Sequence, residues 1–279
     1  MFRETTLTVI FCFVTAFCFI TATAGAEEAE NLVVHIDSVT YEGNQTEETP
    51  LKLYMSGEKV EVVPEDRRSY FIFRGDKELV WLVDKQQETY IQIDEELLAE
   101  VKSQIEQMKE QLEGMPDQQR AMVGSMMKQE MQQAGLAVED KKELKYNHTD
   151  ETKEINNYPC RKTEIQRDSE LVGDLWVTDW ENIKHEDILK SAYRSMTNFV
   201  NSLRDIFEES MYQQYIEVSF IPPDVEEELE GMLISAVHYN NSDQPVAETT
   251  LIKIESKDLS GKTFTPPENY RLEKPELPE

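Results

Sequence analysis

The chain has 279 residues, with 56 Asp and Glu against 28 Lys and Arg, which gives a formal net charge of -28. This acidity excludes a nucleic-acid binder, which needs a basic surface, and it excludes electrostatic docking on an anionic membrane. Three Cys and ten Gly exclude disulfide-dense and collagen-like proteins, whereas a 39% share of hydrophobic residues suffices for a packed core.

The first 26 residues are predicted to be a secretory signal peptide. Arg3 precedes an apolar run over residues 7–22, which is shorter than the roughly 20 residues of a membrane-spanning helix. Ala24 and Ala26 supply the small side chains of a cleavage site. We therefore expect a periplasmic or secreted protein with no stable membrane span. An uncleaved anchor is the alternative, because Glu4 weakens the positive start of the segment.

The predicted signal peptide determines which of the three cysteines the mature protein would keep. Cys12 and Cys18 lie inside it, and the Phe residues before them do not match a lipidation signal. Cleavage would leave Cys160 alone, so no internal disulfide is expected. A small buried side chain is the favoured interpretation of Cys160, and a reactive thiol or an intermolecular bridge is the alternative.

The residues after the signal alternate between apolar and polar, with short polar turns, as β-strands do. One apolar run, residues 79–83, is continuous, which is typical of a strand that is covered on both faces. The predicted strands span residues 32–41, 51–55, 59–63, 70–73, 79–83 and 89–93. Their close spacing predicts an antiparallel meander.

A helical hairpin is predicted to interrupt the strands over residues 94–134. Asp94 is placed to cap its first helix, whose apolar residues recur every three or four positions. Asp117 is placed to cap the second helix, which we expect to end near residue 133.

Strands resume in the second half and are separated by a long helix. The strands are predicted over residues 143–148, 151–155, 161–166, 171–177, 232–239 and 246–254. The helix is predicted over residues 185–212, from apolar side chains at spacings of three and four. Residues 266–279 are rich in Pro and Glu and are predicted to be a loose acidic tail. We expect residues 27–265 to form a single domain.

Several short segments occur in an order that resembles a known family. They are residues 71–76, 80–84, 88–91, 158–162 and 174–178, followed by a closing Phe264-x-x-Pro267-x-x-Tyr270. In this order the chain resembles the LolA/LolB-like superfamily of outer-membrane lipoprotein carriers, and within it a secreted bacterial family of unknown function. The resemblance implies an α+β fold, with a curved antiparallel sheet or half-open barrel whose concave face the helical hairpin and the further long helix cover. In the characterised carriers this hollow takes acyl chains.

The resemblance also implies a ligand-binding hollow lined by apolar and aromatic side chains. The candidate residues of this hollow and its lid are Phe71, Phe73, Trp81, Tyr90, Met108, Leu112, Met122, Met126, Trp176 and Phe199. Alternation puts Phe71 and Phe73 on one face of their strand and Tyr70 and Ile72 on the other, and the pattern leaves open which face is concave. Ordinary core packing is the competing interpretation of the aromatic residues.

Six of the eleven Met residues fall within residues 108–131. Thioethers bind copper(I), but no His or Cys lies in this stretch, so we expect no metal site there. Met side chains adapt to varied apolar surfaces, so an adaptable apolar lid that closes on a ligand is one interpretation. Ordinary packing of helices on the sheet is the alternative.

No sequence signature indicates an enzyme or a cofactor. The chain has no Gly-x-Ser-x-Gly elbow, P-loop or dinucleotide fingerprint, and its four His are scattered. We therefore hypothesise a non-enzymatic cell-envelope protein that binds a lipid or the acyl chain of a lipidated partner. The alternative is a protein-interaction or sensor module of the envelope that has the same fold, a filled core and no ligand.

Overall fold

The computed structural model describes residues 31–43, 45–66, 68–114, 116, 119, 122, 144–208, 229, 231–240 and 242–274. The predicted signal, most of the second helix of the predicted hairpin and the last five residues lie outside this part of the chain.

Within these residues, twelve strands form one open sheet in the order β12-β6-β5-β4-β3-β2-β1-β11-β10-β9-β8-β7. Neighbouring strands pair antiparallel, except that β12 pairs parallel to β6. The strands are β1 Leu32–Glu42, β2 Gln45–Ser56, β3 Lys59–Pro64, β4 Ser69–Arg74, β5 Leu79–Asp84, β6 Thr89–Ile93, β7 Leu144–Ile155, β8 Tyr158–Arg167, β9 Glu170–Thr178, β10 Met232–Tyr239, β11 Pro245–Ser256 and β12 Arg271–Glu273.

Tight two-residue turns set the register of the hairpins in the second half. Asn156 and Asn157 join β7 to β8 with φ of 49° and 69°, and Asp168 and Ser169 join β8 to β9 with φ of 50° and 72°. Asn and Asp tolerate this left-handed backbone, and two such residues in succession match the right-handed twist of the flanking strands. The polar pairs in the sequence therefore fix where these strands reverse.

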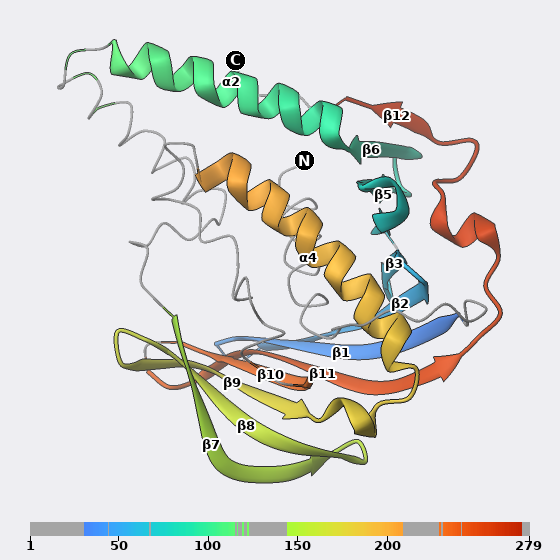
Figure 1. The fold of residues 1–279 in the computed structure, drawn as a ribbon, viewed down its shortest axis with the longest axis vertical. Coiled ribbons are helices and arrows are strands. Elements are labelled where there is room, and N and C mark those ends of the chain that lie inside the picture. The colour runs from blue at the N-terminus through green and yellow to red at the C-terminus, as the bar shows by residue number, and fades with distance from the viewer. Residues whose placement is uncertain are drawn as a thin grey trace.

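Two long helices accompany the sheet, α2 over Glu95–Glu113 and α4 over Glu186–Glu208. Asp94 caps α2, since its Oδ1 accepts a hydrogen bond of 3.0 Å from the backbone N–H of Leu97. This bond, with a second from the Gln92 amide, holds the pKa of Asp94 below its ordinary value. Figure 1 shows the sheet curving around α4, with α2 lying beyond α4 near the β6 end of the sheet.

The two faces of the sheet carry separate hydrophobic clusters. The concave-face cluster includes Phe71 and Phe73 of β4, the strands on either side and the buried side of α4. The outer-face cluster includes Tyr70 and Ile72, and it packs against Phe264 from the C-terminal segment. Because α4 packs on the face that carries Phe71 and Phe73, that face is the concave one.

The fold is mostly β, with a largely antiparallel sheet of twelve strands and two helices in the described residues. The first helix of the predicted hairpin is α2, whereas its partner lies outside the described part. Residues 271–273 were expected in a loose tail, yet they form β12 at the edge of the sheet. The parallel pairing of β12 brings the C-terminal segment back along β6.

Candidate functional site

Helix α4 fills the curve of the sheet with one apolar side. Its buried residues recur at spacings of three and one, as one helix face requires; they are Leu189, Ala192, Tyr193, Met196 and Phe199. Gly75, in the short helical turn Gly75–Lys77 after β4, lets α4 approach closely, because a Cβ at this position would collide with Oγ of Ser195. Helix α4 is therefore a fixed part of the core.

Helix α2 is packed much less completely than α4. It contacts α4 and β6, and none of its described side chains is buried. Leu98 and Val101, which share one helix face, are half-buried, and Leu98 packs against the concave-face cluster. Helix α2 therefore lies against α4 and the concave-face cluster, with Leu98 as a described point of contact.

The sequence-predicted aromatic residues divide between the two faces. Phe71, Phe73, Trp176 and Phe199 are buried and belong to the concave-face cluster. Trp81 lies in the outer-face cluster, and the half-buried Tyr90 packs against that cluster. Neither residue therefore belongs to a hollow beneath α4. The expectation that all six line one hollow is corrected here by the strand alternation of β5 and β6.

The predicted lid residues are only partly within the described chain. Met108 and Leu112 fall in α2, but their side chains are outside the described part, as is the whole of Met126. Met122 is described, and its side chain is 63% exposed. A large apolar side chain in water is available to contact a ligand or another segment.

Helix α4 also carries polar atoms that sequence reasoning missed. Oγ1 of Thr197 and Oδ1 of Asn201 are both shielded from water, and neither has a hydrogen-bond partner in the described protein. The two residues are four positions apart, so they lie one above the other on the same side of the helix. An unsatisfied buried polar atom costs about 1–3 kcal/mol, so a hydrogen-bond partner for either atom would be stabilising.

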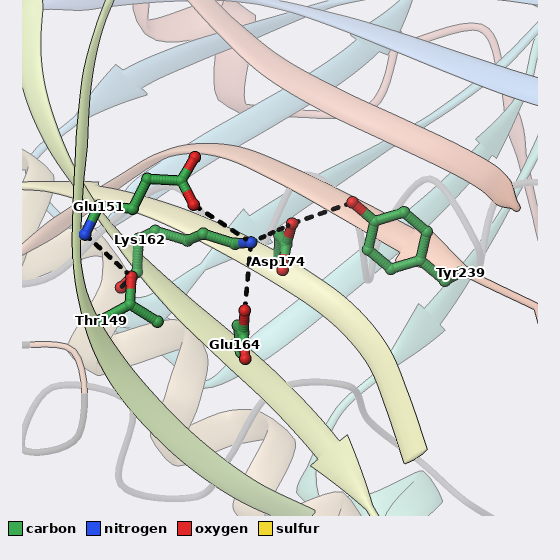
Figure 2. Close-up of polar contacts among 6 residues, drawn as sticks. All are labelled: Thr149, Glu151, Lys162, Glu164, Asp174 and Tyr239. Atoms are coloured by element: carbon green, nitrogen blue, oxygen red, sulfur yellow. Dashed lines mark hydrogen bonds and ion pairs between the residues drawn. The ribbon is translucent and has the colours of Figure 1, made fainter. Parts of the chain in front are cut away.

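A polar network centred on Lys162 links four strands at the other end of the sheet (Figure 2). Nζ of Lys162 lies 3.1 Å from Oδ2 of Asp174, 3.2 Å from Oε1 of Glu164 and 3.6 Å from Oε2 of Glu151. Tyr239 donates a 2.9 Å hydrogen bond to the same Oδ2 of Asp174. The side chains of Lys162 and Asp174 are only 13% and 9% exposed.

The charges of this network stabilise one another and hold neighbouring strands together. Partial burial acts to lower the pKa of Lys162, but its bonds to Asp174 and Glu164 and the charge of Glu151 outweigh burial and hold the pKa above its ordinary value. Burial and the Asp174 carboxylate raise the pKa of Tyr239 to about 12. Lys162 is therefore a protonated counter-ion to the carboxylates of β7, β8 and β9, and the bond from Tyr239 to Asp174 extends the network to β10.

Cys160 is a small buried side chain. It is 1% exposed and belongs to the concave-face cluster, and its Sγ lies 3.3 Å from the carbonyl oxygen of Tyr158. Burial raises the pKa of the thiol to about 11. The protonated thiol is a poor nucleophile, so the interpretation of a reactive thiol is not supported.

In the described ranges, no group of three His, Cys, Asp or Glu side chains is arranged to hold a metal ion. Across the same ranges, none of the helices has the length and apolar character that crossing a membrane requires.

No family model and no curated protein matches the chain. Among solved structures, it is similar to an uncharacterized conserved protein from Thermus thermophilus, with 5% identity over 97% of this chain and 99% of that chain and a TM-score of 0.41. It is similar to a DUF1329 family protein from Desulfovibrio piger, with 8% identity over 86% and 91% of the two chains and a TM-score of 0.29. A LolA superfamily protein from Nitrosomonas europaea matches with 8% identity over 93% and 96% and a TM-score of 0.27. The last of these proteins is described as a member of the superfamily that the sequence resembles.

Proposed function

We propose that this is a non-enzymatic, exported cell-envelope protein that holds an apolar ligand between α4 and α2. The observation that carries the proposal is the contrast between the two helices. Helix α4 is locked into the concave face by buried side chains, whereas no described side chain of α2 is buried. Outward movement of α2 would uncover apolar surface without unfolding the sheet.

The chemistry of this place suits a lipid or the acyl chain of a lipidated partner. Residues of the concave face are apolar from β1 to β5, so an alkyl chain inserted beside them would leave water. Each buried CH₂ contributes about 0.8 kcal/mol, so a chain of about 14 carbons can supply several kcal/mol after ordering costs. Export rests on the predicted signal with its cleavage site after Ala26.

The polar atoms on α4 add a preference for an amphiphile over a plain hydrocarbon. Asn201 Oδ1 accepts a hydrogen bond, and the Thr197 hydroxyl can donate or accept one. A ligand with a hydroxyl or amide N–H next to its alkyl chain would satisfy both side chains. The predicted helical hairpin, of which α2 is the first arm, is the element that we propose to move.

The test is uptake of a fluorescent fatty acid by the mature protein. Leu98→Asp and Val101→Asp place a charge on the inner side of α2, and we expect each to weaken uptake by about tenfold because a charge cannot enter apolar surroundings unpaired. Ser103→Asp is the matched control, since Ser103 is exposed on the same helix. If Leu98→Asp and Val101→Asp take up as much fatty acid as Ser103→Asp, with unchanged circular dichroism, then α2 is not part of the binding site.

A second function has one observation in its favour. The described part of the concave face is packed by α4 itself, as the full burial of Phe71 and Phe73 demonstrates. A filled core suits an interaction or sensor module of the envelope that uses its outer surface. This function predicts a stable protein complex and no bound lipid, and the same uptake assay separates the two.

A further inference from the structure

A pocket of about 290 Å³ lies on the outer face of the sheet, away from α4. Its walls come from β2, β3 and the turn after β5 on one side, and from residues 257–263 of the C-terminal segment on the other. Val63 and Leu259 supply apolar surface, and Tyr54 supplies an aromatic ring. The pocket therefore joins two parts of the chain that are distant in sequence.

Two lysines line this pocket, Lys85 from the turn after β5 and Lys257 from the C-terminal segment. Nζ of Lys85 lies 5.0 Å from the centroid of the Tyr70 ring, and Nζ of Lys257 lies 5.5 Å from that of Tyr54. Both lysines line the pocket, and within the described chain neither forms an ion pair with a carboxylate. A tyrosine face partly offsets an ammonium charge but leaves its N–H donors available to a ligand.

Hydroxyl donors complete the lining. Ser260 lines the pocket, and its Oγ accepts a 3.3 Å hydrogen bond from the backbone N–H of Lys262, so its own O–H remains a donor. Thr263 adds a second hydroxyl. Of the two carboxylates in the lining, Glu61 has an interaction of its own, and Asp258 is exposed to water.

The pocket wall is held in place by buried contacts. Arg74 forms two bonds of 2.7 Å to the Asp76 carboxylate, and its Nη1 donates to the carbonyl oxygen of Phe264 at 3.3 Å. Phe264 is 3% exposed, and the backbone N–H of Lys257 donates to the carbonyl of Asn31 at 2.9 Å. Because both ends of the segment are tied down, the donors need little reorganisation to receive a ligand.

We infer that this pocket binds a small carboxylate with an aromatic or apolar body. The carboxylate would lie between the Lys85 and Lys257 ammonium groups and accept hydrogen bonds from the Ser260 and Thr263 hydroxyls. The body would lie against Tyr54, Val63 and Leu259. The site is separate from the proposed lipid site, so each can fail without the other.

Titration of the mature protein with benzoate, followed by NMR of the Lys and Tyr side chains, tests this inference. We expect saturable shifts at the pocket, weaker binding as salt is raised, and at least a fivefold loss of affinity in Lys85→Gln and in Lys257→Gln. Lys262→Gln is the matched control, because Lys262 belongs to the same segment but pairs with Glu268 at 3.0 Å outside the lining. We expect it to bind benzoate as the wild type does.

Inorganic phosphate serves as the second probe, because it has the charge without the apolar body. We expect phosphate to bind at least fivefold more weakly than benzoate. The inference is overturned if benzoate does not saturate, if the double variant Lys85→Gln/Lys257→Gln binds as tightly as wild type, or if phosphate binds as well as benzoate. Thermal midpoints of all variants within a few degrees of wild type establish that the fold is intact.

Discussion

The ring of Phe199 in α4 meets the ring of Phe73 in β4 edge to face, with centroids 5.8 Å apart and an interplanar angle of 61°. Such a contact adds about 0.5–1.5 kcal/mol beyond the burial of the rings. It joins the middle of the helix to the concave face, where both side chains are buried. The contact is the main reason to regard α4 as a fixed part of the core.

Phe199→Ala should lower the free energy of unfolding by about 3–5 kcal/mol, the usual cost of removing a buried Phe. Urea unfolding followed by circular dichroism measures the change. Asn198→Ala, at an exposed neighbouring position, should change it by less than about 0.5 kcal/mol. If the two variants are equally stable, α4 is not anchored through this ring.

Lys162→Met should destabilise the protein by about 3 kcal/mol, because it leaves the nearly buried Asp174 carboxylate without its counter-ion. Lys253→Met is the control, since Lys253 and Glu255 form an exposed pair whose loss should change the stability little. Adding Asp174→Asn to Lys162→Met should recover part of the loss. No recovery in the double variant would mean that Lys162 acts through packing and not through charge.

The Cys160 thiol should react slowly with a disulfide reagent at pH 8 in the native protein and rapidly in guanidinium. Its native pKa of about 11 exceeds the ordinary 9.0, so the unfolded state loses the proton first. The stabilisation is complete below pH 9.0 and falls as the pH rises toward about 11. The stability difference between wild type and Cys160→Ala should shrink over the same window. Fast, stoichiometric labelling of the native protein would contradict the buried thiol.

Asp76→Asn should loosen the C-terminal segment, because it removes the charged partner that orients Arg74 toward Phe264. The hydrogen bonds from Arg74 hold the pKa of Asp76 below its ordinary value. Its contribution to stability is therefore present above about pH 4 and is lost as the pH falls through the native pKa. We expect faster amide exchange over residues 259–264 at pH 7 and a smaller effect of the substitution at pH 2. An effect that is independent of pH would exclude the charge as its cause.

Local patterns in the sequence predicted much of this fold. Asp94 was expected to cap a helix, and α2 begins at Glu95; the long helix expected over residues 185–212 is α4, Glu186–Glu208. The continuous apolar run 79–83 predicted a strand covered on both faces, and β5 contributes to both clusters. These features depend on neighbours in sequence, so one chain suffices to predict them.

Features that depend on strand pairing were not predictable in this way. Trp81 was placed in the hollow with Phe71, but the register sets it opposite Ile72, which faces outward. The Lys162 network draws residues from four strands, and in a chain with 56 acidic residues no local pattern distinguishes its three carboxylates. The pocket at Lys85 and Lys257 likewise forms only when the C-terminal segment returns along the sheet.

Native mass spectrometry of the protein, expressed with its predicted signal and purified without detergent, tests the proposed ligand most directly. We expect an adduct of lipid-like mass that organic extraction removes and that Leu98→Asp lacks, while Ser103→Asp retains it. The mass of the polypeptide alone, together with no uptake of a fluorescent fatty acid, would contradict a carrier and favour the interaction module.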